Sequence, residues 1–277
     1  TKAVFEGWAT DTEVRFAASS GGILSALALH AIEQAGMNAV VHTHADSEKP
    51  WLNRTVISHN RGEIIERAGS RYAPSSPCEA LDYIEKAPRP CLFIGKPCDA
   101  AAVSALRRFR PALDKNLGLV LSFFCAGTPC TEATLNLVSS HGISADQILS
   151  LNYRGQGWPG SFRVNVKDES RDEREEPDFD KDSGRTALKL SYEESWGSLA
   201  RRTRPLRCHL CPDGLGGFSD ITGGDAWHRH GEEGNPGRSL VLVRSRRGME
   251  MLEGARQAGY LNLVSSSPEA VIAAQPM

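Results

Sequence analysis

The sequence has 277 residues, a net charge of −2, 40% hydrophobic residues and 24% charged residues. This profile is typical of a globular chain that forms one large domain or two modest ones. The charge gives no basis for binding nucleic acid or a membrane surface. The longest apolar runs, such as residues 117–127, are too short to span a bilayer.

The first residues and the cysteine count bear on location. TKAVFEGWATDTEVRF contains no basic stretch followed by an apolar one, so no export signal is visible. The chain has seven cysteines, and an odd number in a chain of this size argues against a secreted disulfide framework. We therefore expect a reducing, cytoplasmic location, where clustered cysteines more often bind metals or act as catalytic thiols.

The first half of the chain alternates between helix-like and strand-like stretches. Helices are predicted at 21–36, near 60–68, near 78–86, at 98–109 and at 131–142. Strands are predicted at 39–44, 90–95 and 117–124. Because strands that alternate with helices form βαβ units, we predict an α/β fold with a largely parallel sheet.

The pattern changes after residue 145. Strands are predicted at 148–155, 161–168, 185–192, 239–245 and 260–264, with a helix at 247–259. Residues 169–184 are almost wholly charged or small, and they predict an exposed loop. The predicted fold is a mixed, largely parallel sheet with flanking helices and a C-terminal α+β portion. We expect an N-terminal part, 1–145, and a C-terminal part, 146–277, that together form one compact unit.

Two loops of the N-terminal part have features of a ligand site. Ser19, Ser20, Gly21 and Gly22 lead into a helix, whose free N–H groups and dipole suit a phosphate. The turn matches neither standard nucleotide fingerprint, and on local evidence we favour plain helix capping. Residues 69–77 hold an arginine beside a tyrosine, which can grip a phosphate and stack on a ring. A surface loop with a half-buried tyrosine explains them equally well.

Single cysteines follow two successive predicted strands. Cys98 begins a helix beside Lys96, and Cys125 follows the strand at 117–124. We expect the helix dipole and the lysine to lower the pKa of the Cys98 thiol. If the two strands are neighbours, their ends lie about 5 Å apart, so both thiols reach one metal centre.

The stretch RCHLCPDG supplies two more thiols, Cys208 and Cys211. The chain has no second C-x-x-C, which excludes a zinc ribbon with two such knuckles, and the following proline and glycines weaken a thioredoxin interpretation. Together with the two strand-end thiols, the pair makes four cysteine ligands, which suit zinc or a 4Fe–4S cluster equally by count. We expect His209 to point away. Asp213, Asp220 and Asp225 surround the motif, as ligand-binding acids or as ordinary turn residues.

Seven segments, in this order, resemble the beta subunit family of deazaflavin (coenzyme F420) hydrogenases and dehydrogenases, with its 7-hydroxymethyl chlorophyll a reductase and 8-vinyl reductase relatives. They are SSGGILSALALHAIE, AGSRYAPSSP, FIGKPCDAAAVSAL, LSFFCAGTPC, YRGQGWPGSFRV, RCHLCPDGLGGFSDITGGDAW and SLVLVRSRRGMEML. The resemblance extends from Trp8 to Leu263. Many relatives carry a further cysteine-rich stretch, and nothing of the kind precedes Trp8. We therefore expect a trimmed chain, or a member with one cluster and an external electron donor.

The resemblance implies an iron–sulfur flavoprotein oxidoreductase that passes electrons between a 4Fe–4S cluster and FAD. By this resemblance, the ligands of the cluster are Cys98, Cys125, Cys208 and Cys211. By the same resemblance, the residues that contact FAD are Ser19, Ser20, Gly21, Gly22, Ser70, Arg71, Tyr72 and Lys96. The charge of Lys96 near the flavin would favour an anionic reduced form.

The resemblance also implies partners. The electron donor or acceptor is ferredoxin-like or a deazaflavin, and the enzyme reduces or oxidises a small organic substrate. No proton donor is assigned, and Asp225 and His209 are the candidates. One alternative is an electron-transfer subunit of a larger complex without an organic substrate of its own. Another is a zinc-stabilised binding module with no redox role. A homo-oligomer and a subunit of a complex both fit the sequence.

Overall fold

The structure is a computed structural model that describes residues 1–167, 184–200, 203–232 and 234–275. Its strands are β1 (Ala3–Ala9), β2 (Val40–Ala45), β3 (Asn53–Ser58), β4 (Cys91–Gly95), β5 (Leu117–Phe123), β6 (Ile148–Asn152), β7 (Ser161–Lys167), β8 (Gly184–Ser191), β9 (Ile221–Asp225), β10 (Ser239–Val243) and β11 (Leu261–Ser265). Its α-helices are α1 (Thr12–Ala17), α2 (Ile23–Glu33), α3 (Arg61–Glu66), α4 (Leu81–Lys86), α5 (Pro97–Leu106), α6 (Pro111–Asn116), α7 (Thr131–Ser139), α8 (Tyr192–Leu199), α9 (Leu206–His209), α10 (Arg246–Gln257) and α11 (Pro268–Ala274). Short 3-10 helices are η1 (Pro77–Ala80), η2 (Ala145–Gln147) and η3 (Trp227–Arg229). Within these described ranges, no helix has the length and apolar character needed to cross a membrane.

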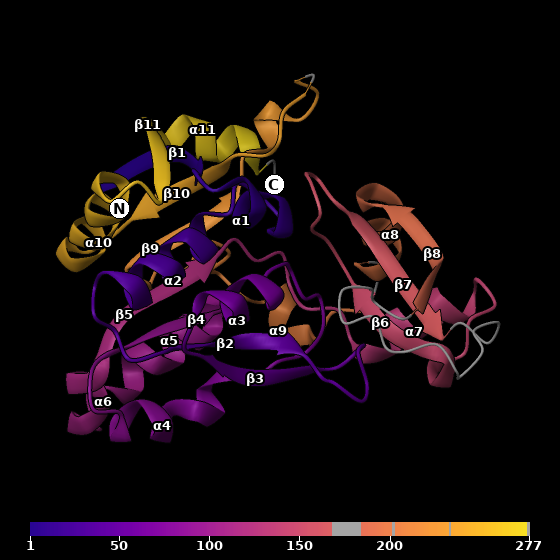
Figure 1. The fold of residues 1–277 in the computed structure, drawn as a ribbon, viewed down its shortest axis with the longest axis horizontal. Helices are drawn as coiled ribbons and strands as arrows, with labels where there is room; N and C mark the ends of the chain where they lie inside the picture. Colours follow the sequence, from indigo (N-terminus) through magenta and orange to yellow (C-terminus); the bar gives the residue numbers. More distant parts are fainter. Residues whose placement is uncertain (168–183, 201–202, 233, 276–277) are drawn as a thin grey trace.

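The larger sheet has eight strands in the order β11-β1-β10-β9-β5-β4-β2-β3 (Figure 1). Its centre is parallel, because β2 pairs with β4, β4 with β5, and β5 with β9 in that sense. Its two edges are antiparallel, formed by β3 on one side and by β10, β1 and β11 on the other. The predicted mixed sheet with a largely parallel core is therefore confirmed, and the end of the chain returns to it through β9, β10 and β11.

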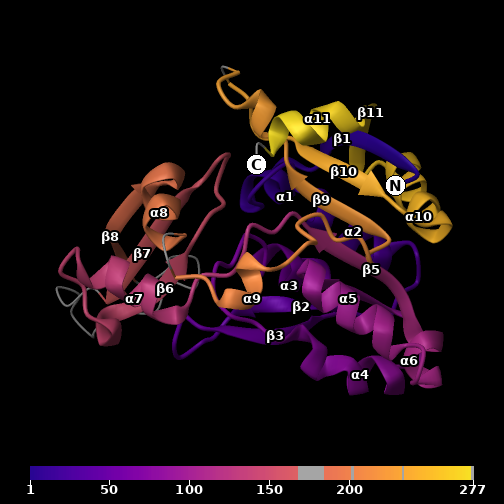
Figure 2. The same cartoon turned by 180° about the vertical axis from the view of Figure 1, so that it is seen from behind.

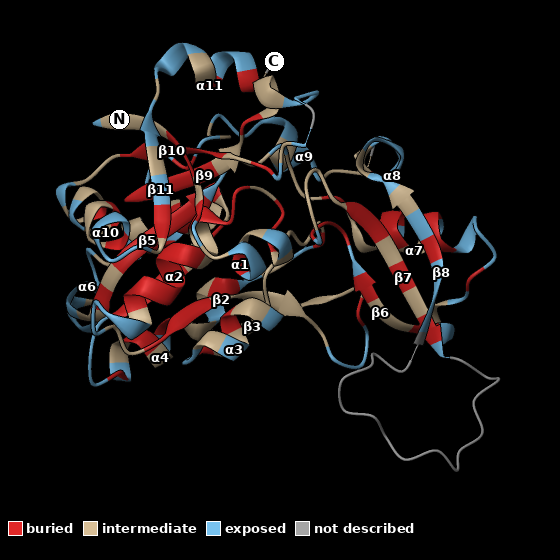
Figure 3. Ribbon diagram, turned by 45° about the horizontal axis from the view of Figure 1, so that its top comes forward, coloured by how far each residue is buried: buried red, intermediate tan, exposed pale blue. Residues whose placement is uncertain are grey.

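Helices cover both faces of this sheet. On one face α2, α3 and α10 bury their apolar side chains against the strands, and Figure 3 shows α2 as mostly buried. On the other face α4, α5 and α6 pack in the same way. The alternation of a strand accounts for this: Leu92 belongs to the first cluster and Phe93, the next residue, to the second. Short apolar strands between amphipathic helices are typical of such two-sided sheets.

A smaller antiparallel sheet, β6-β7-β8, lies beside the larger one with α7 and α8 (Figures 1 and 2). Its own core contains Tyr153 and Phe162, both almost completely buried. The hydroxyl of Tyr153 shares a hydrogen bond of 2.8 Å with Thr134 Oγ1 of α7, which ties the helix to the sheet. The charged stretch predicted as an exposed loop, 169–184, lies outside the described residues except for its last residue, which begins β8.

Three strands were not predicted: β1, β3 and β9. The last is the sequence ITGGD, which contains two glycines and an acid that also suit a turn. It forms a strand because its backbone pairs with β10 on one side and β5 on the other. Gly224 leaves room for the ring of Phe124, which any Cβ atom there would overlap. The strand then ends at Asp225, beside the ends of β4 and β5. Asp225 therefore does not lie in a turn.

Candidate functional site

A cavity of about 300 Å³ opens at the carboxyl ends of β4, β5 and β9, between the larger and the smaller sheet. Ligands of open α/β sheets bind at such strand ends. The lining comes from segments far apart in the chain and includes Ser19, Gly22, Tyr72, Lys96, Cys125 and Asp225. The two predicted loops and the end of β4 therefore meet at one cavity.

The N-terminus of α2 faces the cavity without a capping side chain. Its N-cap is Gly22, in the left-handed conformation at φ 78°, and among the described residues no side chain accepts a hydrogen bond from the first turn. The interpretation as plain serine capping is wrong, because both serines bond elsewhere. Ser19 Oγ accepts from the backbone N–H of Ser70 at 2.5 Å, and Ser20 Oγ donates to the carbonyl of Arg238 at 3.0 Å. The first turn thus presents free N–H groups and the positive end of the helix dipole to the cavity.

Arg71 lines the cavity but mainly holds the protein together. Its Nε donates to Asn53 Oδ1 at 2.9 Å, and its Nη1 donates to the carbonyl of Leu151 at 2.7 Å. Its Nη2 donates to the carbonyls of Pro50 and Leu52. An arginine has five N–H donors, so one remains for a ligand. Arg71 could therefore donate only that one N–H to a phosphate, fewer than its sequence context predicts.

Lys96 also lines the cavity, with its charge already paired. Its Nζ lies 2.7 Å from Asp99 Oδ2, 2.6 Å from Ser75 Oγ and 3.1 Å from the Ser75 carbonyl. These contacts account for all three ammonium donors. The carboxylate of Asp99 cancels much of the positive field that Lys96 was expected to exert on a bound ring.

The remaining candidates are placed differently. Gly21 packs behind the cavity lining, where a Cβ would lie 2.6 Å from the carbonyl oxygen of Gly7. His209 is exposed and does not line the cavity. Asp213 accepts hydrogen bonds from the backbone N–H groups of Leu215 and Gly217, as a turn residue does.

A buried ion pair joins the two sheets at the cavity wall. Arg154, whose side chain is 2% exposed, donates from Nη2 to Asp225 Oδ1 at 2.8 Å and from Nη1 to Oδ2 at 2.9 Å. The indole Nε1 of Trp158 donates to the same carboxylate at 2.9 Å. Asp225 therefore acts as the acceptor that holds the loop after β6 against the end of β9.

Aromatic rings complete this wall. Tyr192 and Trp196 of α8 stack with their planes 8° apart, and Tyr192 stacks on Trp227 at a centroid distance of 4.9 Å. The guanidinium of Arg154 lies over the rings of Tyr192 and Trp227. Burial raises the pKa of both Tyr72 and Tyr192, so these hydroxyls stay protonated near the cavity.

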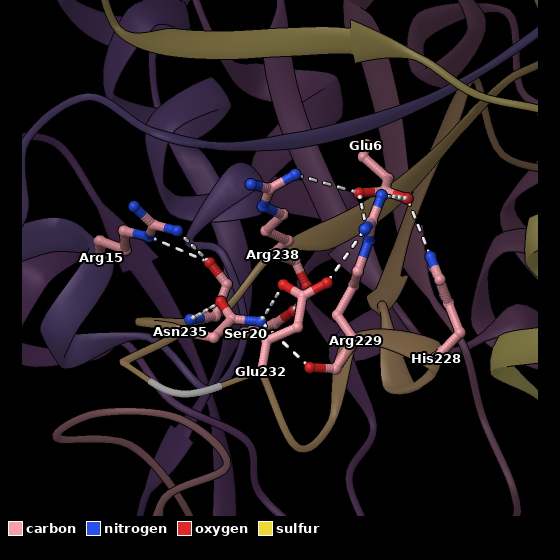
Figure 4. A network of polar contacts seen from close by, with 9 residues as sticks. Glu6, Arg15, Ser20, His228, Arg229, Glu232, Asn235 and Arg238 are labelled. Atoms are coloured by element: carbon pink, nitrogen blue, oxygen red, sulfur yellow. Dashed lines mark hydrogen bonds and ion pairs between the residues drawn. The ribbon is translucent and has the colours of Figure 1, made fainter.

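A second polar network anchors the segment that carries Trp227. Figure 4 shows two arginines and a histidine turned toward the buried carboxylate of Glu6 on β1. His228 Nε2 lies 2.9 Å from it, Arg229 contacts both of its oxygens at 3.3 Å, and Arg238 lies at 3.5 Å. Burial raises the pKa of Glu6, but the hydrogen bonds from His228 and Arg229 outweigh it and leave the pKa below its ordinary value. The charged carboxylate fixes this segment against the sheet.

The strand-end cysteines lie at one edge of the sheet. The strands β4 and β5 are parallel neighbours, with Gly95 opposite Ser122, so Cys98 and Cys125 follow adjacent strand ends. The condition set for the two thiols, that their strands are neighbours, is therefore met. Of these two cysteines, Cys125 lines the cavity.

The C-x-x-C pair lies against the same edge. Cys208 is in α9 and Cys211 follows it, and the backbone N–H of Cys125 donates to the carbonyl of Gly214 at 2.9 Å. A Cβ on Gly127 would lie 3.4 Å from the Cβ of Cys208. The thiols of Cys98 and Cys208 act electrostatically on that of Cys125, which places the three in one neighbourhood. Cys211 is exposed at the surface.

The thiols of Cys98 and Cys125 have pKa values above that of a free thiol. Burial raises the pKa of Cys125, and the neighbouring thiols raise it further. Burial also raises the pKa of Cys98; Asp99 adds to this, whereas Lys96 and Arg207 act in the opposite direction. The expected lowering of the Cys98 pKa is therefore wrong, because burial outweighs the lysine.

The thiols are neighbours but do not converge on one point. Within the described ranges, no three histidine, cysteine, aspartate or glutamate side chains stand close enough to hold a single metal ion. All seven cysteines are free. A 4Fe–4S cluster holds its four thiolates around a cube of iron and sulfide, farther apart than the ligands of one zinc ion.

Several wall residues were not identified from the sequence, above all Arg154 and the rings of Tyr192, Trp196 and Trp227. The signal available was the segment YRGQGWPG, which contains Arg154 and Trp158. A local motif does not show that its arginine meets an aspartate 71 residues further along the chain. Only the fold brings the two together.

The fold and this cavity define a ligand-binding α/β protein of the open-sheet class. Two family models match the chain. The first, described as coenzyme F420 hydrogenase/dehydrogenase, beta subunit N-term, matches residues 4–82, and the model for the C terminus of the same beta subunit matches residues 89–269. The chain belongs to this beta subunit family, a family of oxidoreductase subunits. The predicted resemblance is thus confirmed.

Individual relatives agree. A coenzyme F420 hydrogenase subunit beta from Methanosarcina barkeri (strain Fusaro / DSM 804) is 31% identical over 253 residues, covering 87% of this chain and 74% of the relative. One from Methanococcus voltae is 23% identical over 266 residues, covering 94% and 83%. A chain of the F420-reducing NiFe hydrogenase complex from Methanosarcina barkeri, studied as a xenon derivative, matches with a TM-score of 0.71 at 18% identity. That match covers 98% of this chain and 87% of the other, and it shows a shared fold.

Proposed function

We propose that this protein is an electron-transfer subunit of a larger redox complex, working in a reducing cytoplasm. It binds FAD in the cavity and one 4Fe–4S cluster on Cys98, Cys125, Cys208 and Cys211. Bound together, these groups exchange electron pairs at one end and single electrons at the other. Membership of a family of hydrogenase and dehydrogenase beta subunits supports this function over a stand-alone reductase with its own organic substrate. The names of the relatives support a deazaflavin as the two-electron partner.

The observation that carries the proposal is the uncapped N-terminus of α2. Its free N–H groups face the cavity, where they would bind the phosphates of FAD, and the first turn carries no acidic side chain. Glycine suits this position because the backbone of Gly22 is in the left-handed conformation, which disfavours residues with a Cβ. The aromatic wall of Tyr192, Trp196 and Trp227 offers an apolar boundary for a planar ring.

The position of Cys125 supports electron transfer between the two groups. It lines the cavity and neighbours the thiols of Cys98 and Cys208, so one residue borders both proposed sites. Cluster binding requires thiolates, and the raised pKa values of Cys98 and Cys125 mean that assembly releases protons. We therefore expect cluster assembly to be favoured by mildly alkaline pH.

The test is anaerobic reconstitution with iron, sulfide and FAD, followed by absorption spectroscopy and metal analysis. We expect flavin bands together with a broad visible absorption that dithionite bleaches, and about four iron atoms per chain. Cys208→Ser should abolish the broad absorption and retain flavin, whereas the control Cys130→Ser should retain both. A colourless protein that contains zinc would refute the proposal, and survival of the broad absorption in Cys208→Ser would refute the ligand assignment.

A further inference from the structure

Three buried side-chain atoms lack a hydrogen-bond partner within the part of the chain that the structure describes. They are Ser122 Oγ, Arg204 Nε and His228 Nδ1. A buried polar atom left unpaired costs free energy, so each one calls for a physical explanation. Arg204 Nε carries an N–H and can only donate, and it comes from the segment that reaches Cys208 four residues further on. An acceptor is therefore expected beside it.

The guanidinium of Arg204 is fixed over the loop that follows Cys125. Its Nη1 donates to the carbonyl of Ala126. Its Cδ packs on Gly127, where an added Cβ would lie 2.5 Å from it. Because Nε is bonded between these two ends of the side chain, its N–H lies over the peptide that joins Ala126 to Gly127. The same point above Gly127 is 3.4 Å from the Cβ of Cys208, so Arg204 and Cys208 contact one side of this loop.

Backbone hydrogen bonds join the two segments on either side of this contact. The N–H of Cys130 donates to the carbonyl of Thr203 at 3.1 Å, and the N–H of Cys125 donates to the carbonyl of Gly214 at 2.9 Å. Burial raises the pKa of the Cys125 thiol, and a hydrogen bond from the backbone N–H of Gly127 acts against it. The peptide whose carbonyl binds Arg204 thus directs its own N–H at that thiol.

The unpaired donor does not belong to the proposed FAD site. Ala126, Gly127 and Thr128 line the cavity, whereas Arg204 is not among its lining residues. Arg204 therefore lies on the side of the loop that faces Cys208 rather than the cavity. The thiolate and sulfide sulfurs of an iron–sulfur cluster accept hydrogen bonds, and such bonds help to set its reduction potential. A cluster in this place would satisfy the orphaned N–H.

We propose that Arg204 completes the iron–sulfur site, with its Nε–H donating to a sulfur atom of the bound cluster and raising the reduction potential of that cluster. The inference rests on the proposed function, because it requires a cluster on Cys125 and Cys208. When the cluster accepts an electron it gains one negative charge, while Arg204 stays protonated and no covalent bond forms or breaks. A buried donor that is also a cation stabilises the added charge, so the reduced form is favoured.

The test is a potentiometric titration of the reconstituted full chain, with the reduced cluster followed by EPR. Arg204→Met removes both the charge and the donor. The ratio of reduced to oxidised cluster at a fixed potential should fall about tenfold, which is a downward shift of about 59 mV. Arg204→Lys keeps the charge but has no donor at the position of Nε, and the ratio should fall about threefold. Added salt should change neither result, because the Nε atom is buried.

Two other arginines serve as matched controls. Arg207 is exposed in α9, and its charge acts on the thiol of Cys98. Any shift in Arg207→Met should therefore disappear as salt is added. Arg89→Met changes an exposed arginine at the amino end of β4, away from the cysteines, and should keep the wild-type potential. Iron content and EPR line shape should be the same in all of these proteins, which shows that the cluster itself is not distorted.

A spectroscopic measurement tests the contact directly. With arginine labelled with ¹⁵N at Nε, pulsed EPR of the reduced wild-type cluster should show a ¹⁵N coupling. Arg204→Lys should remove this coupling, and Arg207→Lys should retain it. If Arg204→Met fails to assemble a cluster, Arg204→Lys and the coupling decide the assignment.

The outcomes separate the role of Arg204 from the proposed function. A wild type without iron–sulfur absorption refutes the proposed function, and the role of Arg204 with it. An intact cluster whose potential is unchanged in Arg204→Met and Arg204→Lys refutes the role of Arg204 alone. A wild-type potential in Arg204→Lys together with a lowered one in Arg204→Met would show that charge suffices, which overturns the hydrogen bond from Nε.

Discussion

The two sheets of this protein contribute to the cavity in different ways. The eight-stranded sheet brings three parallel strand ends together, and the cysteines, Lys96 and the start of α2 follow from that arrangement. The three-stranded sheet is antiparallel, has its own core and adds a wall of rings and one arginine. The candidate cofactor-binding groups thus lie mainly on the eight-stranded sheet, at the ends of its parallel strands. The smaller sheet closes the cavity.

The connection between the two sheets is polar. Arg154 after β6 meets Asp225 at the end of β9, and Arg71 reaches from the first half of the chain to the carbonyl of Leu151. Both cations are surrounded by protein and satisfied mainly by oxygen atoms of other segments. Buried polar contacts of this kind have strict geometry, so they fix the position of one sheet on the other more closely than apolar contact does.

The largest expected effect comes from breaking this connection with Asp225→Asn. The amide cannot neutralise Arg154, whose side chain is 2% exposed, so a positive charge stays buried without its partner. We expect a loss of about 3 kcal/mol in the free energy of unfolding, measured by urea denaturation. A loss of less than about 1 kcal/mol would mean that the ion pair does not hold the sheets together.

The matched control for this substitution is Glu253→Gln on α10. Glu253 pairs with Arg256 in an exposed i,i+3 contact on the surface of the larger sheet's helices. Solvent already screens this pair, so the urea midpoint should not change. The contrast between the two carboxyl-to-amide changes isolates burial as the cause.

Much of the larger sheet was predictable from the sequence. The short apolar runs 90–95 and 117–124 contain the strands β4 and β5, and the helices between strands have local start and stop signals. The order of a parallel sheet then places Cys98 and Cys125 at one edge without further information. Strand β1 was missed because both of its pairing partners, β10 and β11, come from the end of the chain. The edge strand β3 was missed because its sequence, NRTVIS, lacks a clear alternation.

The hydrogen-bond partners and the pKa of each site residue were harder to predict than its position. Lys96 and Arg71 do line the cavity, but their donors are committed to Asp99, Ser75 and backbone carbonyls. The pKa of the Cys98 thiol moves up rather than down because burial outweighs a nearby cation that is already paired. Charge compensation depends on three-dimensional neighbours, which spacing in the sequence does not reveal.

The second prediction concerns pH and the larger sheet alone. Burial, followed by the charges of Arg67 and His44, lowers the pKa of His42 to about 4, from an ordinary value of 6.5. The folded protein therefore keeps His42 neutral where the unfolded chain binds a proton. Stability is complete above pH 6.5 and falls as the pH drops from 6.5 toward 4, by about 3 kcal/mol for this residue.

The measurement is urea denaturation at several values between about pH 4 and 7, for the wild type and His42→Gln. Glutamine keeps a polar contact with Ser58, which lies 2.8 Å from His42 Nε2, and it does not titrate. The variant should lose less stability on acidification than the wild type. His44 also has a pKa of about 4, so part of the slope should remain. Parallel curves for the two proteins would contradict a buried neutral His42.

The third prediction tests the close packing behind the cavity. Gly21→Ala places a Cβ 2.6 Å from the carbonyl oxygen of Gly7 and 2.7 Å from the backbone nitrogen of Ser239. Neither backbone atom can rotate away, so we expect a loss of about 2 kcal/mol in unfolding free energy. The control is Gly62→Ala in α3, where the nearest atom to the added Cβ would be Asn60 Oδ1 at 3.5 Å. This substitution should not destabilise the protein. Equal midpoints for the two variants would show that the turn before α2 tolerates displacement.

The smallest expected effects come from glycine-to-alanine substitutions in and after the helices of the smaller sheet. One should raise the free energy of unfolding and the other should lower it. Gly197 is exposed within α8 with open space around it, so Gly197→Ala should stabilise the protein by about 1 kcal/mol through helix propensity. Gly142, after α7, is equally open but has φ +77°, so Gly142→Ala should destabilise it by about 1 kcal/mol.

Amide hydrogen exchange under native conditions would show where each change acts. If exchange changes in β6, β7 and β8 while β4 and β5 keep their rates, the smaller sheet opens separately. If both sheets change together, the Arg154–Asp225 connection makes them one cooperative unit.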